Sequence, residues 1–481
     1  MIRSTLSATA QALETRTGRW IFWIAVVVTF LGMGLNAVIR AELPQKTFVA
    51  NPHYISPTEI AEDSDSQAQW RSSEFRGFRT IAWGELMEGV DPYRLQHVRA
   101  YPPFFGIAFF PFAALWSIPF AGSALFFTVS FIFALAAAWC CSAWAEGVRS
   151  AGCGVRNPDD LRESAIRNPQ SAFGAPRFGV FALTFILLAP LALDVMERCE
   201  SDMLVLFPVA AAFYWLTRGE KKFRAGILLG FAAAFKVLPG LFGVYLLFTR
   251  QWRALGGMIF AGVVCTVVLP VLLFGPQRAW QLHRSWYERV VAPYQSGQTT
   301  KFIGDPYRPS NQSLTAAFNR LLRPLPMDAS KGERNINLLS LSPKTVSALV
   351  KALQLTVALG LMLLWALCGR GKDAKSAAIL MAAVAPGIML LSEVSLTSHH
   401  VLLILPVAAI VVRMLVLEDA VAERWAWVLI VYLLALLGVA IQPFKPFTPL
   451  LPATVALLLA CVGVALRDRQ VDPASPRIPY C

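Results

Sequence analysis

Charged residues are scarce in this chain, and its cysteines follow no recognisable pattern. Only 15% of the 481 residues are Asp, Glu, Lys or Arg, whereas about a quarter is usual for soluble domains. The eight cysteines include no Cys-x-x-Cys motif and no Cys/His spacing typical of zinc ligands. The composition therefore argues against a soluble enzyme, a zinc module and a disulfide-stabilised scaffold.

What the sequence has instead is apolar residues, which make up 56% of the chain and fall in runs long enough to cross a bilayer. We expect one polytopic membrane domain over residues 1–481. The run that starts at Trp20 lacks a small-residue cleavage site, so we expect an anchor rather than a signal peptide. The net charge of +13 needs no nucleic acid, because Lys and Arg in cytoplasmic loops orient membrane proteins.

The apolar runs predict an all-α integral membrane protein with about twelve transmembrane helices and both ends inside. Two of these spans are short and meet at Lys236-Val-Leu-Pro239, because a lysine in the middle of the bilayer is costly and proline interrupts a helix. The expected spans are 20–39, 123–145, 178–193, 203–217, the two within 225–248, 254–274, 346–367, 376–392, 399–412, 425–441 and 449–466.

This topology predicts two long outer segments, 40–120 and 275–344, with the loop 147–177 and the tail 467–481 inside. In the first outer segment, helical spacing predicts an interfacial helix that ends at Gly89. Its apolar stripe is Phe75, Phe78, Ala82 and Leu86, with Arg79, Glu85 and Glu88 placed off the stripe. Two prolines interrupt the apolar run 103–120, which we expect to be a second shallow helix rather than a span.

The unusual polar groups then gather on the outer face, where they suit sugar transfer from a lipid phosphate. An inverting transfer of this kind needs one general base to take the proton of the acceptor hydroxyl. It needs no second carboxylic acid of the kind that glycosidases use, because the phosphate leaves as an anion. It does need cations beside that phosphate.

Seven short motifs resemble those of one enzyme family, glycosyltransferase family 87. These are the bacterial mannosyltransferases that use polyprenyl-phosphate mannose, within the multi-span C superfamily. The resemblance covers roughly residues 20–415 and rests on Glu74-Phe75-x-x-Phe78, Gly89-Val-Asp-Pro-Tyr93, Tyr101-Pro-Pro103, Glu200-Ser-Asp202, Ala225-Gly226 with Lys236-Val-Leu-Pro239, Asn311-Gln-Ser-Leu314 with Arg320, and Ser395 with His399-His400.

The resemblance implies transfer of a hexose, mannose first, from a polyprenyl-phosphate donor to a glycan, lipid or protein acceptor on the outer face of a bacterial plasma (inner) membrane. Glu74 would be the catalytic base, with Asp63 and Asp65 as alternatives. No cofactor is expected, and a divalent metal stays open. The substrate-binding candidates are Arg79, Asp91, Tyr93, Arg99, Tyr101, Glu200, Asp202, Lys236, Asn311, Gln312, Arg320, His399 and His400.

Each candidate also has a plain structural explanation. Glu74 suits a helix N-terminus, Asp91 suits a turn, and Lys236 can extend its ammonium group to the interface. The chain also departs from the family pattern: Glu74 replaces an aspartate, acids replace the Gln and Asn of Gly-Gln-x-Asn, and the Trp before His-His is missing. A multi-span transporter or flippase, or a non-catalytic assembly protein, therefore stays an alternative.

Overall fold

The computed structural model describes residues 1–42, 74–89, 91–94, 101–115, 117–118, 120–144, 177–295, 309–325, 336–369 and 374–470. Within these ranges the protein is built from helices and has no β-strand, apart from one isolated bridge between Asn311 and Leu396. The Arg99 candidate and the alternative bases Asp63 and Asp65 lie outside the described residues.

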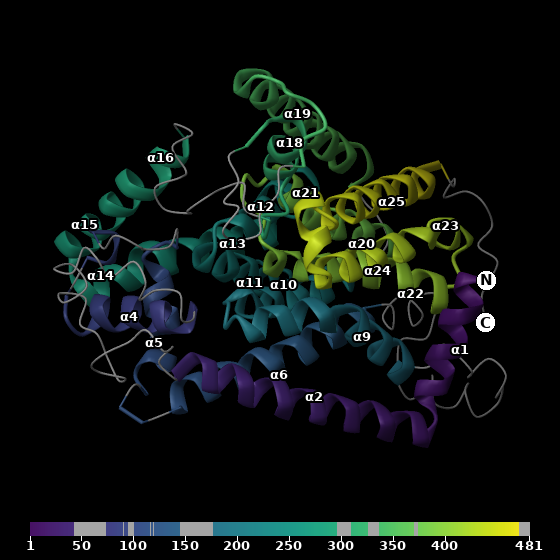
Figure 1. Cartoon of the computed structure of the whole chain (residues 1–481), viewed down its shortest axis with the longest axis horizontal. Helices are drawn as coiled ribbons and strands as arrows, with labels where there is room; N and C mark the ends of the chain where they lie inside the picture. Colours follow the sequence, from purple (N-terminus) through teal and green to yellow (C-terminus); the bar gives the residue numbers. More distant parts are fainter. Residues whose placement is uncertain are drawn as a thin grey trace.

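Eight helical segments of the described chain are long and apolar enough to cross a membrane, which confirms the all-helical membrane class (Figure 1). They are α2 (Arg16–Glu42), α6 (Ala121–Ala143), α9 (Arg177–Glu197), α13 and α14 (Trp252–Val263 and Leu269–Phe274, joined by the π-turn Val264–Val268), α19 (Pro343–Cys368), α20 and α21 (Ala374–Ala382 and Val384–Leu391), η7 and α22 (Thr397–Leu403 and Ile404–Leu415), and η8 and α25 (Gln442–Phe447 and Leu450–Gln470).

Shorter helices complete the described structure. Four apolar ones are α5 (Phe104–Ala113), α10 (Asp202–Thr217), η3 with α12 (Leu238–Gly240 and Leu241–Phe248) and α24 (Trp427–Ala440). The others are α1 (Ile2–Glu14), α4 (Glu74–Leu86), η2 (Pro92–Arg94), α11 (Lys222–Phe235), α15 (Pro276–Trp286), η5 (Tyr287–Val291), α16 (Ala292–Gln295), α18 (Leu314–Leu322) and α23 (Ala420–Arg424). The count of about twelve spans stays a prediction.

Helices α10 and α22 form the centre of the molecule. Nearly every residue of each is buried, as expected of helices that are apolar on all sides. Helix α10 packs on α6 and α11, while α9 packs on both α22 and η7, the turn that leads into α22. The N-terminal ends of these two central helices therefore sit in rigid surroundings.

The predicted corner at Lys236 is confirmed. Helix α11 ends at Phe235, Lys236 has an extended backbone, and the chain continues through η3 into the short helix α12. Because α12 returns the chain, α13 runs parallel to α11, with Gly226 against Ala254 and Gly230 against Met258. A glycine at these points lets the two backbones approach closely, as in many membrane helix pairs.

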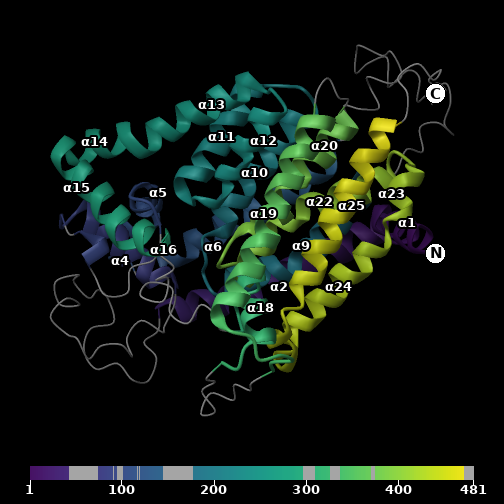
Figure 2. The same ribbon diagram turned by 90° about the horizontal axis from the view of Figure 1, so that it is seen from above.

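The helices that follow the first span and those that follow α14 lie together at one end of the molecule. Helices α4, α5, α15 and α16 lie there, and α1 and α23 lie at the opposite end (Figures 1 and 2). Helix α5 has ten residues, a length of about 15 Å, so it is too short to cross a hydrocarbon core of about 30 Å. This agrees with the prediction that residues 103–120 do not form a span.

Two of the three charged residues expected on the polar face of α4 are buried, whereas the third, Glu88, is exposed. Arg79 and Glu85, both placed off the apolar stripe, are only 7% and 2% exposed. The guanidinium of Arg79 lies 5.9 Å from the centre of the Phe75 ring. Since α4 packs closely on α5, the face of α4 that carries Arg79 and Glu85 belongs to the protein interior.

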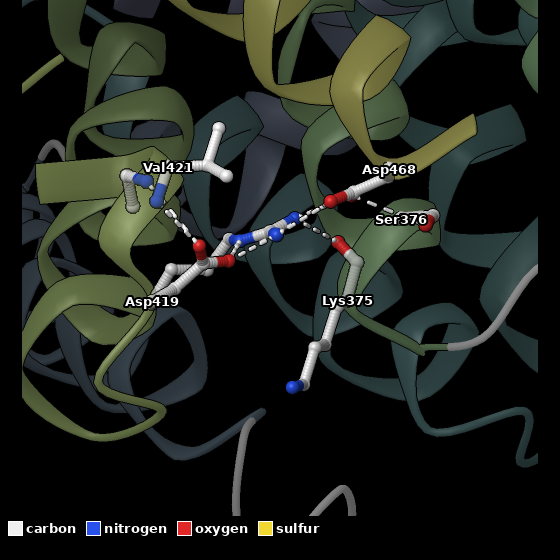
Figure 3. A network of polar contacts seen from close by, with 7 residues as sticks. Lys375, Ser376, Asp419, Val421 and Asp468 are labelled. Carbon is white, nitrogen blue, oxygen red and sulfur yellow. Dashed lines mark hydrogen bonds and ion pairs between the residues drawn. The ribbon is translucent and has the colours of Figure 1, made fainter. Parts of the chain in front are cut away.

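A buried charge network joins the helices at the opposite end (Figure 3). Arg413, in the last turn of α22, donates to Asp468 of α25 through two bonds of 2.7 and 2.8 Å and is also bonded to Asp419. Asp468 accepts a further bond from Ser376 of α20. Because each charge in this network is paired, it is a clamp between helices rather than an open binding site.

Candidate active site

The centre of the candidate site is an ion pair between two helix ends. Lys236 follows the last residue of α11, Asp202 is the first residue of α10, and their Nζ and Oδ1 atoms lie 2.6 Å apart. The two side chains are only 12% and 6% exposed. Nζ of Lys236 also lies 5.7 Å from the centre of the Tyr101 ring. Both partners were predicted, and the structure brings them together.

Several polar atoms around this pair form no hydrogen bond of standard geometry within the described part of the chain, although the Ser398 side chain lies close enough to interact with both the Glu200 and the Asp202 carboxyl groups. These polar atoms are Oδ2 of Asp202, Oγ of Ser398 and Nδ1 of His399. Buried polar groups in proteins nearly always have partners, so unsatisfied ones that cluster point to a site that takes a polar ligand. Ser398 did not emerge from the sequence, where only the two histidines that follow it drew notice.

Glu200 brings a second carboxyl group beside the pair. Helix α9 ends with Cys199 in the left-handed region and a bond from the Glu200 N–H to the Val195 carbonyl oxygen, which places Glu200 just before α10. Burial, together with the nearby Asp202 carboxylate, raises the pKa of Glu200 above its usual value. A protonated Glu200 adds no negative charge, and it can donate a hydrogen bond.

The Asp-Pro-Tyr motif positions Tyr101. The Tyr93 hydroxyl donates to the Tyr101 carbonyl oxygen at 2.9 Å, and the Tyr93 N–H donates to Oδ1 of Asp91 at 3.0 Å. Ser285 of α15 donates to the other carboxylate oxygen of Asp91 at 2.6 Å. Asp91 and Tyr93 therefore fix the segment that presents the Tyr101 ring, whose hydroxyl lies 3.3 Å from Oγ of Ser201. Substrate contact by Asp91 or Tyr93 stays a prediction.

Glu74, the expected base, begins helix α4, which contacts the Lys236 site through Tyr101. Glu74 is the first residue of α4, and its side chain lies outside the described residues. Phe78, one turn later, packs edge-to-face on Tyr101 with 5.4 Å between ring centres. Because residues four apart share a helix face, the start of α4 and Lys236 lie on the same side of the molecule, joined through Tyr101.

The described hydrogen bonds of Asn311, Gln312 and Arg320 hold segments of the chain together. Asn311 accepts bonds from the Ser313 and Ser395 N–H groups and donates to the Glu393 carbonyl oxygen. These bonds hold the 311–314 segment against 393–396. The side chains of Gln312 and Arg320 bond backbone around η8, at Lys445, Leu450 and Pro446. These three residues build the support under η7, and the substrate-binding role stays a prediction for them.

The two adjacent histidines differ in their surroundings. His400 is buried, and its Nδ1 lies 3.0 Å from the Leu396 carbonyl oxygen, so this nitrogen carries the proton. His399 is partly exposed, its Nδ1 has no partner among the described residues, and it interacts electrostatically with Asp202. His399 is therefore the better candidate for ligand contact.

Glu85 is a candidate that the sequence reasoning missed. Its carboxyl group lies between α4 and α5, and its Oε1 has no hydrogen-bond partner in the described structure. Burial raises the pKa of Glu85 to about 8, against a smaller opposing effect of Arg278. The signal was present in the sequence: Glu85 follows Phe78 by seven residues, which is two helical turns and hence the same buried face.

A small cavity lies beside Glu85, with room for about one water molecule. Tyr101 lines this cavity and also faces Lys236, so the cavity and the ion pair share one wall. The residues that line it are Ile81, Glu85, Tyr93, Tyr101, Pro102, Phe105 and Gly106. No group of three or more His, Cys, Asp or Glu side chains in the described ranges could hold a metal ion.

Comparison with known proteins identifies one family. The model of glycosyltransferase family 87 matches residues 100–393, which is more than half of the chain. The matched region contains Tyr101, Asp202 and Lys236, whereas Glu74 and His399 lie outside it. No curated protein and no solved structure matches the chain.

Proposed function

Because this chain belongs to glycosyltransferase family 87, we propose that it transfers a hexose, mannose being the first candidate, from a polyprenyl-phosphate donor to a glycan, lipid or protein acceptor. An acceptor hydroxyl oxygen attacks the anomeric carbon as the bond from that carbon to the phosphate oxygen breaks. The electron pair leaves with the polyprenyl phosphate, the anomeric configuration inverts, and a base takes the hydroxyl proton.

The observation that carries this proposal is the buried Lys236–Asp202 pair with unsatisfied polar atoms around it. A phosphate needs positive charge, and Lys236 supplies one that Asp202 orients. The pair is neutral as a whole, so the phosphate calls for a further cation. Arg99 is the candidate for it, and His399 can donate a hydrogen bond to a phosphate oxygen as a neutral imidazole. A protonated Glu200 carries no negative charge, so it would not repel the phosphate.

Glu74 is the proposed base. A carboxylate at the first residue of α4 lies one turn from the helix face that contacts Tyr101, and Tyr101 faces Lys236. Phe78 and Lys236 both contact the Tyr101 ring, so the start of α4 and the phosphate-binding cation border the same aromatic side chain. An inverting transfer needs a base and a cation that act on opposite sides of the sugar, since the acceptor approaches from the side opposite to the leaving phosphate.

We place this reaction on the non-cytoplasmic face of the plasma (inner) membrane. Helices α4 and α5, which contact the candidate site, lie at the end of the molecule away from α1 (Figure 2). Arg3 in α1 and Arg16 and Arg19 in α2 favour a cytoplasmic location for that opposite end. A donor with a polyprenyl tail would reach such a site from the lipid, because the sugar and phosphate are polar while the tail stays in the bilayer.

A transfer assay tests the proposal. Membranes that contain the protein are supplied with radiolabelled polyprenyl-phosphate mannose and cell-envelope lipid, and new glycosidic products are separated from the donor. We expect transfer by the wild type and a loss of at least about a hundredfold in Glu74→Gln, the order of magnitude that a general base contributes. Labelled donor that crosses the bilayer without a new glycosidic bond would instead support a transporter.

A further inference from the structure

Helix α15, with the turn η5 that extends it, has one face on the protein and one face open to its surroundings. Ala279 and Leu282 are buried, whereas Trp280 is 70% exposed, and Arg284 and Tyr287 are exposed as well. The last three follow one another at helical spacing, so their side chains share one open face of the helix. Membrane proteins concentrate tryptophan and tyrosine where hydrocarbon meets water.

We propose that α15 docks on the bilayer, with Trp280, Arg284 and Tyr287 in the headgroup region of the leaflet at this end of the molecule, and that its opposite face holds the Asp-Pro-Tyr motif in place. The partner is phospholipid, since the two rings suit the boundary between acyl chains and headgroups and the guanidinium suits a phosphate. The docking does not depend on the proposed reaction, whereas its effect on sugar transfer rests on that reaction.

The position of α15 directly after a span favours lipid as the partner. Leu272 and Leu273, near the end of the span 252–274, are 73% and 54% exposed, as expected of side chains that face hydrocarbon. Gly275 has a positive φ of 78° and Pro276 follows it, so α15 does not continue the line of α14 (Figure 2). The open face of α15 therefore begins where the apolar span ends, which is the level of the headgroups.

The charge of this segment suits a surface of lipid phosphates. Residues 276–291 contain three arginines and one glutamate, a net charge of +2 with histidine neutral. Glu288 bonds Arg284 at 2.7 Å, and the two side chains remain 54% and 68% exposed. Because a guanidinium has five N–H donors, Arg284 can bond this carboxylate and a phosphate together. Basic residues near a membrane surface are attracted to anionic lipid.

The opposite face of the segment contacts the candidate site. Ser285 of α15 donates to Asp91 at 2.6 Å, and Val290 of η5 lies in one buried cluster with Tyr93. The Tyr93 hydroxyl in turn donates to the Tyr101 carbonyl oxygen. A helix docked on the lipid is thus connected, through the Asp-Pro-Tyr motif, to the aromatic ring that borders the buried ion pair.

A depth measurement tests the docking without the reaction. The full chain, with Cys153 and Cys481 replaced by alanine, carries a nitroxide label in Trp280→Cys and is placed in vesicles of phosphatidylethanolamine and phosphatidylglycerol. Electron paramagnetic resonance compares relaxation of the label by oxygen, which enters lipid, with relaxation by a nickel chelate, which stays in water. We expect oxygen to dominate at position 280. The matched control is Gln281→Cys, exposed but about 100° further round the helix, where the nickel chelate should dominate.

Two results of this measurement would overturn the docking. A label at position 280 that the nickel chelate relaxes more than oxygen does would place the open face in water. A label shielded from both reagents would show that another protein, or a second copy of this chain, covers the face instead of lipid.

Sugar transfer measures the connection between the docked helix and the site. Ser285→Ala should lower kcat/KM about tenfold, the effect of one hydrogen bond to a charged group, without changing the depth of the label at position 280. Ser285→Thr keeps the hydroxyl and should recover most of the loss. Trp280→Gln should lower kcat/KM severalfold, whereas Gln281→Ala should behave as the wild type. Unchanged transfer in both Ser285→Ala and Trp280→Gln would overturn the connection.

The two measurements distinguish a failure of the docking from a failure of the proposed reaction. If the label at position 280 lies in lipid but the wild type transfers no sugar, the docking stands and the reaction fails. If sugar is transferred while the label lies in water, the docking is wrong and the reaction stands. Unfolding temperatures of all variants separate misfolding from a lost contact.

Discussion

Lys236 and Asp202 each depend on the other to remain charged in a buried position. Removing one partner leaves an uncompensated charge, at a cost of about 3–5 kcal/mol in buried pairs. We expect Lys236→Met to lower the free energy of unfolding by this order of magnitude, and the double variant Lys236→Met/Asp202→Asn to recover most of the loss. Chemical unfolding in detergent micelles measures both.

Recovery of stability should not bring recovery of activity. The double variant restores a neutral interior but supplies no cation for the phosphate, so sugar transfer should stay at least about a hundredfold below wild type. If Lys236→Met were as stable as the wild type, Asp202 would not depend on Lys236 in its buried position. A double variant with full transfer would exclude Lys236 from the reaction.

Glu85 makes the stability depend on pH. Below pH 4.5, its usual pKa, both the folded and the unfolded chain carry the proton. Between pH 4.5 and about 8 the unfolded chain loses the proton while the folded chain keeps it, so the contribution of Glu85 to the free energy of unfolding falls as the pH rises. Glu85→Gln, which cannot ionise, should remove this fall.

The difference in unfolding free energy between Glu85→Gln and the wild type should therefore grow from pH 4.5 to pH 8 and then stay level. Its upper limit is about 5 kcal/mol, from roughly 1.4 kcal/mol for each pH unit. Arg278, Asp91 and Tyr93 are the charged or titratable groups that act on this carboxyl or are acted on by it. A difference that does not vary with pH over this range would show that Glu85 is ionised in the folded protein.

At the scale of elements, two adjacent glycines of α13, Gly256 and Gly257, allow a matched test of how α13 packs on α11. A Cβ atom at Gly257 would lie 2.1 Å from the Phe223 carbonyl oxygen of α11, whereas one at Gly256 would meet nothing within 4 Å. Gly257→Ala should push the two parallel helices apart and cost about 1–3 kcal/mol. Gly256→Ala should be neutral or stabilising by up to about 1 kcal/mol, because alanine favours a helix.

Sugar transfer should also fall in Gly257→Ala and stay unchanged in Gly256→Ala, because Lys236 directly follows the last residue of α11. Displacement of α11 moves the ammonium group relative to Asp202, which belongs to the neighbouring helix α10. Thermal unfolding and the transfer assay, applied to both variants, separate close packing from a general effect of the substitution. Equal behaviour of the two variants would contradict the packing that the structure shows.

The long apolar helices could be predicted, because apolar runs and interrupting prolines determine them, whereas the polar helices α1, α15 and α18 were not predicted. Lys236 and Pro239 indicated the corner between α11 and α12 for the same reason. The burial of α4 could not be predicted as readily, because it depends on α5, which supplies Gly106 against Glu85. Nor could the bonds of Arg320 to Thr448 and Pro446, because they join segments that are distant in the sequence.

At the scale of the whole molecule, polar groups concentrate at two separate places. Around Lys236, Asp202 and His399 each leave an atom without a hydrogen bond among the described residues, whereas Arg413 is bonded to both of its carboxylates. Charge alone in the sequence does not distinguish these two cases, since each contains one buried cation with acidic partners. The difference lies in the number of hydrogen bonds that each cation donates to carboxylates, which only the packed helices determine.

The proposed orientation predicts which ends of the molecule meet which compartment. Met87, at the end of α4, is 57% exposed, and the Glu418 side chain beside α23 is 73% exposed at the opposite end. In a background with Cys153 and Cys481 replaced by alanine, Met87→Cys should react with a membrane-impermeant maleimide in bacterial cells whose outer barrier has been opened. Glu418→Cys should react only after the inner membrane is permeabilised.

The six cysteines that lie in the described ranges are all buried, so the background without an introduced cysteine should label weakly in both conditions and serves as the control. Labelling of Glu418→Cys before permeabilisation, with protection of Met87→Cys, would reverse the orientation. A reversed orientation would place the Lys236 site on the cytoplasmic side while leaving family membership intact. The compartment of the donor and acceptor would then change, whereas the roles of Lys236 and Asp202 would not.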